Sequence, residues 1–202
     1  DGSLHIDNNA QLLGSGTSTY TIAGSFTMDQ GGSFTYASTT VIMNATTTGK
    51  TITTSGGQEI TFNTLRFTGV GGGWNINGDI RAQNGISVEN GTVSGTANVT
   101  VLGGSLSGNG TVSMGGGTTT VATTNTLGGT APWTFNNLVL GNGIIVGTTT
   151  AATNATTTIL GRLTIGAAHT FSLGGAHIDL RGSGTVFVES GVFLEGTSTV
   201  RY

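Results

Sequence analysis

The sequence of 202 residues contains no cysteine, a single proline and few charged side chains. Without cysteine, the chain can form neither a disulfide scaffold nor a thiolate metal site. Charged residues make up 7% of the chain, with six Lys and Arg against nine Asp and Glu, whereas an average soluble protein carries about 25%. Because the cations are few and scattered singly, the chain has no basic patch for nucleic acid, and we expect no nucleic-acid partner.

Long apolar runs are also missing. No segment approaches the roughly 20 apolar residues that a membrane-spanning helix requires. No window shows the sustained three- and four-residue apolar spacing of an amphipathic helix. We therefore expect neither membrane insertion nor helices. The chain opens on Asp1 rather than Met, which favours a processed or excised segment, and the absence of cysteine is compatible with export from a bacterial cell.

Glycine and threonine dominate what is present, with 37 Gly and, by direct count, 40 Thr. Both are poor helix formers, Gly because of its backbone entropy and Thr because of its branched Cβ. Apolar and polar residues alternate over short segments such as residues 25–28, 40–43 and 192–194, as in strands with one apolar face. Gly-Gly and Asn-Gly pairs separate these segments, and such residues adopt positive φ at low cost. The sequence therefore predicts an all-β fold with tight corners.

A signature of hydroxyl residues followed by valine occurs three times, at residues 38–41, 118–121 and 197–200. The two spacings between the valines are nearly equal (121−41 = 80 and 200−121 = 79). The related segments 2–6 and 161–165 keep the same register, because 161−2 equals 200−41. This pattern indicates one domain, 1–202, with about two and a half imperfect repeats that are interrupted inside a repeat at both ends. The predicted repeats are 1–41, 42–121 and 122–200.

Strand length favours a parallel β-solenoid, in which each short segment pairs with the coils before and after it. A coil of about 20 residues gives roughly 10 coils, and a spacing of about 4.8 Å per coil gives a rod of roughly 50 Å. A string of β-sandwich domains, one for each repeat, remains an alternative because Asn-Gly suits antiparallel hairpins.

Residues 60–67 (ITFNTLRF) are echoed by residues 133–140 (WTFNNLVL), and Gly-rich alternating segments follow. In this pattern the chain resembles the repeats of large secreted bacterial surface proteins, namely autotransporter passengers and filamentous adhesins. The resemblance implies a right-handed β-solenoid, a location outside the cell or on its surface, and a structural or adhesive role. It implies no catalytic residues.

The few titratable residues form no strong motif. His5 with Asp7, and His177 with Asp179, each share one face of a short strand. Either pair could serve acid-base chemistry, but a polar strand face has the same pattern, and His169 is expected at a corner. Carboxylates occur at most about once per coil, too sparsely for the groove of a polysaccharide-cleaving solenoid, and residues 174–179 approximate a calcium repeat only once. We predict no enzyme activity, cofactor or metal.

The leading functional hypothesis is an extracellular structural protein that stacks head to tail into a filament or surface fibre. Neither end of the sequence has the polar cap that closes many repeat arrays. The strands expected to carry the contact include Leu4 and Ile6 at one end, and Val200 and Tyr202 at the other. The partner would be another copy of the chain, through a contact that propagates without closing.

The alternative hypothesis is an adhesin stalk that binds glycans or cell surfaces. Exposed aromatic side chains such as Trp74, Tyr20 or Trp133 would then stack on sugar rings. Their positions in the repeat make Trp133, Phe62 and Phe135 better candidates for the core. The exposure of the two tryptophans therefore discriminates between the hypotheses.

Overall fold

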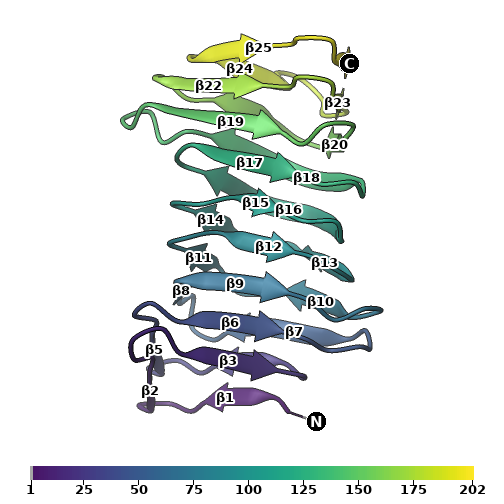
Figure 1. Cartoon of the computed structure of the whole chain (residues 1–202). Coiled ribbons are helices and arrows are strands. Elements are labelled where there is room, and N and C mark those ends of the chain that lie inside the picture. Colours follow the sequence, from purple (N-terminus) through teal and green to yellow (C-terminus); the bar gives the residue numbers. More distant parts are fainter. Residues whose placement is uncertain (1) are drawn as a thin grey trace.

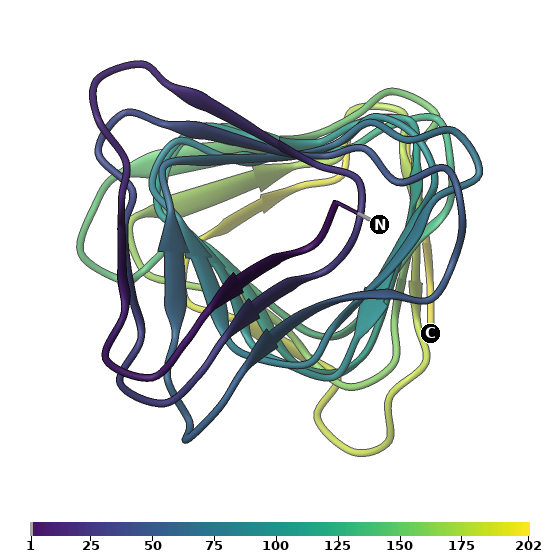
Figure 2. The same ribbon diagram turned by 90° about the horizontal axis from the view of Figure 1, so that it is seen from below.

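Each short alternating segment forms a strand that pairs with the segments one coil before and one coil after it. The computed structural model describes residues 2–202 and contains 26 strands and no helix in that range (Figure 1). Every strand pairing within this range is parallel. Seen from the N-terminal end, the chain runs clockwise as it recedes, which makes the coil right-handed (Figure 2). The prediction of a parallel β-solenoid is confirmed, and the sandwich alternative is wrong.

Three faces surround the core (Figure 2). Face one consists of ten strands or strand halves: β1 (Leu4–Ile6), β4 (Phe26–Met28), β7 (Lys50–Thr54), β10 (Gly73–Ile76), β13 (Thr92–Gly95), the first halves of β16 (Thr111–Val121) and β18 (Trp133–Leu140), β20 (Thr156–Ile159), β23 (His177–Leu180) and β26 (Thr199–Arg201). Because β16 and β18 turn the corner without a break, they join face one to face two in a single 15-stranded sheet.

Faces two and three have nine strands each. Face two contains β2 (Gln11–Leu13), β5 (Ser33–Thr35), β8 (Ile60–Phe62), β11 (Ile80–Ala82), β14 (Val99–Val101), the second halves of β16 and β18, β21 (Leu163–Ile165) and β24 (Phe187–Glu189). Face three contains β3 (Thr19–Ile22), β6 (Thr40–Met43), β9 (Thr64–Phe67), β12 (Ile86–Val88), β15 (Leu106–Ser107), β17 (Asn125–Gly128), β19 (Gly147–Ala151), β22 (His169–Ser172) and β25 (Val192–Leu194).

The repeating structural unit is a coil whose length varies along the chain. Phe26 pairs with Ile52, a long step in the sequence (52−26 = 26), whereas Ile76 pairs with Gly95, a shorter one (95−76 = 19). The molecule therefore makes about nine turns rather than the ten expected from a constant step of about 20. At about 4.8 Å per coil these turns form a rod of roughly 40 Å.

The three hydroxyl-valine signatures lie on three different faces. Val41 is in β6 on face three, Val121 is in β16 on face two, and Val200 is in β26 on face one. The regular spacing of these signatures thus corresponds to no shared position in the coil. What the three segments have in common is the pattern of a strand with an inward-facing valine.

Large side chains fill the narrow core. Phe62, Phe135 and Trp133 are all buried, as the sequence predicts. The rings of Phe26 and Phe62, which come from different coils, meet edge to face at 5.5 Å between centroids, a favoured geometry for aromatic pairs. Stacking therefore joins coils through side chains as well as through backbone hydrogen bonds.

Side chains supplement the backbone hydrogen bonds between coils at the corner between faces one and two. The backbone N–H group of Asn98 donates to Asp79 Oδ1 at 2.8 Å, and the backbone N–H group of Thr118 donates to Asn98 Oδ1 at 2.9 Å. Two coils later, the amide of Arg162 donates to Asn137 Oδ1 at 3.0 Å. We call these three hydrogen bonds the corner ladder. Through them, side-chain oxygens accept from backbone N–H groups at the corner.

Candidate functional site

The N-terminal coil, β1 to β3, has neighbours on only one side (Figure 1). Leu4, Leu12 and Tyr20, one from each face, pack against the core but remain partly exposed. Leu13 is 59% exposed, and its carbonyl accepts a hydrogen bond from the Tyr20 hydroxyl at 3.1 Å. Within the described residues, no loop or helix covers this end of the core (Figure 2).

The C-terminal coil has the same character. Phe187, Phe193 and Val200, again one from each face, are partly buried against the core. Val192 and Leu194 are each 50% exposed, and Tyr202 is 81% exposed. Both ends of the rod therefore present incomplete layers of core side chains.

The end strands also carry unpaired backbone groups. The amide of Leu4 donates to Ser25 in the next coil at 2.9 Å, and the amide of Thr199 donates to Ala176 at 3.3 Å. Because successive residues of a strand direct their backbone groups to opposite sides, the N–H and C=O groups of His5 and Val200 point away from the rod. We call these two rows the open edges. Of the predicted contact residues, Leu4, Ile6 and Val200 lie in the terminal strands, and Tyr202 follows β26 directly.

His5 and Asp7 are joined by a carboxylate from the next coil. The Nε2 atom of His5 lies 3.1 Å from Asp29 Oδ2 and 3.6 Å from Asp7 Oδ1. Asp29 follows β4, which pairs with β1, and its amide donates to the Ile6 carbonyl at 2.9 Å. Within residues 2–202 these three are the one group in which at least three potential metal ligands converge. The sequence pattern identified His5 and Asp7 but missed Asp29.

His177 and Asp179 have different neighbours. Asp179 pairs across the ladder with Thr158 and Arg201, and its Oδ2 atom accepts a hydrogen bond from Arg181 at 3.0 Å. The carboxylate of Asp179 is thus engaged by a cation of its own coil. Glu189 has a structural role as well, because its Oε1 atom accepts the amide of Phe193 at 3.2 Å.

His169 is buried at a corner of face three. Its Nε2 atom lies 2.8 Å from Thr149 Oγ1, which accepts a hydrogen bond from Asn125 Nδ2 at 3.1 Å. Since the Thr149 hydroxyl already accepts from Asn125, it can donate its own proton to Nε2 of a neutral imidazole. Burial lowers the pKa of His169. His169 is the first residue of β22, directly after the corner at which it was expected, and neither its burial nor the three-coil polar stack was expected.

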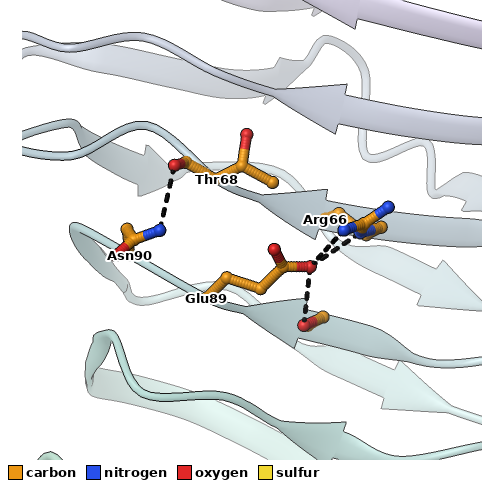
Figure 3. Close-up of polar contacts among 5 residues, drawn as sticks. Arg66, Thr68, Glu89 and Asn90 are labelled. Atoms are coloured by element: carbon orange, nitrogen blue, oxygen red, sulfur yellow. Dashed lines mark hydrogen bonds and ion pairs between the residues drawn. The ribbon is translucent and has the colours of Figure 1, made fainter.

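Two arginine–glutamate ion pairs, Arg66 with Glu89 and Arg81 with Glu59, link successive coils on the rod surface. Arg66 directs Nε and Nη2 at Glu89 Oε1, each at 2.7 Å, and Ser87 donates to the same oxygen at 3.3 Å (Figure 3). The hydrogen bond and the charge of Glu89 raise the pKa of Arg66. Beside this pair, Asn90 Nδ2 donates to the Thr68 carbonyl at 3.2 Å (Figure 3). These groups hold coils together and leave the Glu89 carboxylate engaged rather than free for chemistry.

A polar groove of about 520 Å³ lies between face two and the loop at residues 181–186. Its lining includes Thr118, Asn137, Arg162, Ser183 and Thr185. Arg162 Nε donates to the Thr185 carbonyl at 3.2 Å, which ties the loop to the face. The groove offers hydroxyl, amide and guanidinium groups but no aromatic side chain among the lining residues.

The tryptophans do not form a sugar-binding strip. Trp74 and Trp133 are each 1% exposed, so their assignment as exposed stacking platforms is wrong. Both sit at inward positions on face one, and Trp133 Nε1 donates to the Gly110 carbonyl at 2.9 Å. Gly72 and Gly91 are required beside Trp74, because an added Cβ would lie 2.5 Å and 2.9 Å from its ring. Tyr20 remains partly exposed at the N-terminal end.

Residues 2–202 include no helix long and apolar enough to cross a bilayer. A scan against protein-family models, a search of curated proteins and a search of solved structures each found no match for the chain. The β-solenoid architecture is therefore established by the structure alone. The likeness to autotransporter passengers and filamentous adhesins remains a prediction.

Proposed function

We propose that the protein is an extracellular structural element, a rigid rod whose end coils stack on those of further copies to build a filament or surface fibre. The observation that supports this is the pair of open edges, each accompanied by three partly exposed core side chains, one per face. Unpaired strand edges with apolar flanks are templates for pairing with another chain. The low charge and the bacterial-surface likeness support the location outside the cell.

Head-to-tail contact continues the geometry of the rod. Stacking β1 of one copy on β26 of another keeps the strands parallel, like every described pair within the molecule. The register that continues the ladder places Leu4 over Tyr202, because the column of paired residues that begins at Leu4 ends at Leu180, and Asp179 pairs with Arg201. In this register the backbone groups of His5 and Val200 face the partner copy. Such a heterologous contact has no closing symmetry and therefore propagates.

Substituting Val200 by proline tests this contact. Proline removes the edge N–H group of Val200 and leaves the hydrogen bonds of β26 to β23 in place, since those come from the neighbouring residues. The matched control is Val70→Pro. Val70 is 73% exposed in the turn 69–72, where Gly72 donates to Gly69 at 3.1 Å and Gly71 has φ +78°. Val70 therefore occupies the second position of a type II turn, a position that favours proline.

We expect the wild-type protein and Val70→Pro to form filaments as concentration rises, seen by light scattering and electron microscopy. Aligned filaments should diffract at about 4.8 Å along the fibre axis. Val200→Pro should remain monomeric with an unchanged circular dichroism spectrum. The proposal would be contradicted if the wild-type protein stayed monomeric or formed only closed dimers. It would also be contradicted if Val200→Pro formed filaments as readily as the wild type. Antibody labelling of intact source cells tests the location.

A second candidate function is glycan binding by a stalk, and the groove beside Arg162 favours it. The groove presents the hydrogen-bonding groups that sugar hydroxyls require, and the guanidinium group would select acidic sugars. Binding of alginate, measured by calorimetry, should be lost in Arg162→Gln. The matched control is Arg201→Gln, which lies outside the groove.

A further inference from the structure

We propose that His5, Asp7 and Asp29, here called the His5 cluster, bind a divalent transition-metal ion of the zinc type. One imidazole nitrogen and two carboxylate oxygens are a ligand set that zinc and related ions use at sites with open positions. The three donor groups lie within 4.8 Å of one another. His5 also lies in β1, whose open edge carries the proposed end-to-end contact, but metal binding by the single chain does not require that contact.

The separations of the donor atoms match one ion. Two ligands of a tetrahedral zinc ion, each about 2.1 Å from the metal, are about 3.4 Å apart. The Nε2 atom of His5 lies 3.1 Å from Asp29 Oδ2 and 3.6 Å from Asp7 Oδ1, which brackets this value. Small side-chain rotations therefore suffice to bring all three donors onto one metal.

The backbone fixes the cluster in advance. Asp7 and Asp29 each begin a turn of the same kind, in which the aspartate carbonyl accepts the amide three residues later, from Ala10 and from Gly32, at 2.9 Å. The pairing of β1 with β4 stacks these turns one coil apart. The strand pairing therefore holds the carboxylates of Asp7 and Asp29 side by side, and a bound cation stabilises two neighbouring negative charges. Because the backbone at these residues is already fixed, metal binding has to order only the side chains.

The cluster is open to solvent on the metal side. The side chains of His5, Asp7 and Asp29 are 53%, 80% and 39% exposed. An ion can therefore enter without rearrangement of the rod and complete its coordination with water. The imidazole binds a metal ion through a nitrogen lone pair, in its neutral form.

Titration of the untagged protein with Zn²⁺ by isothermal calorimetry tests the site. We expect one ion per chain, and a loss of affinity of more than about tenfold in Asp29→Asn and in His5→Gln, since removing a direct ligand should exceed the tenfold to hundredfold effect of an outer-shell partner. The matched controls are Asp179→Asn and His177→Gln, which alter the same residue types on the same face and should bind normally. Co²⁺ should give the visible absorption of a site with a nitrogen ligand in the wild type and lose it in His5→Gln.

The alternative is a plain ion pair, in which protonated His5 bridges the two carboxylates. Absence of saturable Zn²⁺ binding in the wild type would establish the ion pair and overturn the proposal. Equal binding in Asp29→Asn or His5→Gln and in the controls would also overturn it. Ca²⁺ binding tighter than Zn²⁺ would contradict the role of the imidazole, because calcium prefers oxygen ligands. Thermal unfolding without metal verifies that each variant is folded.

Discussion

The tripeptide His-Ile-Asp occurs twice on face one, once near each end of the rod, and only one copy belongs to a cluster. Residues 5–7 meet Asp29 of the following coil, whereas Asp179 in the second copy faces Arg201 of the following coil and is bonded by Arg181. The residues that follow the tripeptide differ, since Asn8 and Asn9 follow the first copy and Leu180 and Arg181 follow the second. Part of the difference comes from the residue one coil later in each case (29−7 equals 201−179), and part comes from Arg181 in the same coil. In this fold the chemistry of a motif therefore depends on the next coil as well as on its sequence neighbours.

The largest expected difference between the two motifs concerns their central isoleucines. Ile178 is fully buried between Thr157 and Val200, whereas Ile6 pairs with Met28 on one side only. Ile178→Ala should lower the free energy of unfolding by about 2–5 kcal/mol. Ile6→Ala should cost less, because its end coil can relax toward solvent. Urea denaturation measures both, and equal costs would mean that the end coil is as tightly packed as the interior.

The second motif should become a metal site when its neighbours are exchanged. Arg201→Asp supplies the carboxylate that corresponds to Asp29, and Arg181→Ala releases Asp179 from its cation. We expect the double variant to bind two Zn²⁺ ions per chain where the wild type binds one, with calorimetry as the measurement. Binding at the new site should weaken by more than about tenfold when His177→Gln is added. An unchanged stoichiometry would show that the next coil does not suffice to determine the chemistry.

His169 offers a buried counterpart to the two exposed histidines. Burial lowers its pKa in the folded state, so on acidification the unfolded chain binds the proton more readily. Stability is therefore complete above the ordinary histidine pKa of about 6.5 and decreases as the pH falls below it. The urea midpoint should decrease less on acidification in His169→Gln than in the wild type. In the control variant His177→Gln it should decrease as in the wild type.

The smallest effect is expected for the cation of the second motif. The Arg181 side chain is 65% exposed, and exposed ion pairs contribute about 0–1 kcal/mol. Arg181→Ala should therefore change the free energy of unfolding by less than about 1 kcal/mol, measured by urea denaturation at low and high salt. A larger loss would show that the pair also holds the loop at residues 181–186.

Much of the architecture follows from local pattern. Short alternating segments separated by Gly and Asn corners predict stacked strands, and the positions of Phe62, Phe135 and Trp133 predict burial. The neighbours of a given strand could not be predicted, because the length of the coil changes along the chain. For this reason the sequence revealed His5 with Asp7 but not Asp29. For the same reason the evenly spaced hydroxyl-valine signatures lie on three different faces.

The polar stack around His169 had no local signal. Asn125, Thr149 and His169 come from three coils and are 24 and 20 residues apart. Each resembles an ordinary corner residue in the sequence, since short polar side chains are common where a chain turns. Only the register of β17, β19 and β22 brings them into contact. Sites of this kind require the pairing before they can be recognised.

The corner ladder has a mechanical consequence. Tension along the rod acts parallel to the hydrogen bonds between coils, so we expect the molecule to open one coil at a time and not to shear as a whole. The side chains of Asp79, Asn98 and Asn137 add hydrogen bonds at this corner to those that the backbone already makes between coils. The coils that these three bonds join are thereby held together at one corner as well as along their faces. If such rods form a fibre, we expect it to lengthen in small steps as single coils open under load. The coils would pair again when the load is removed.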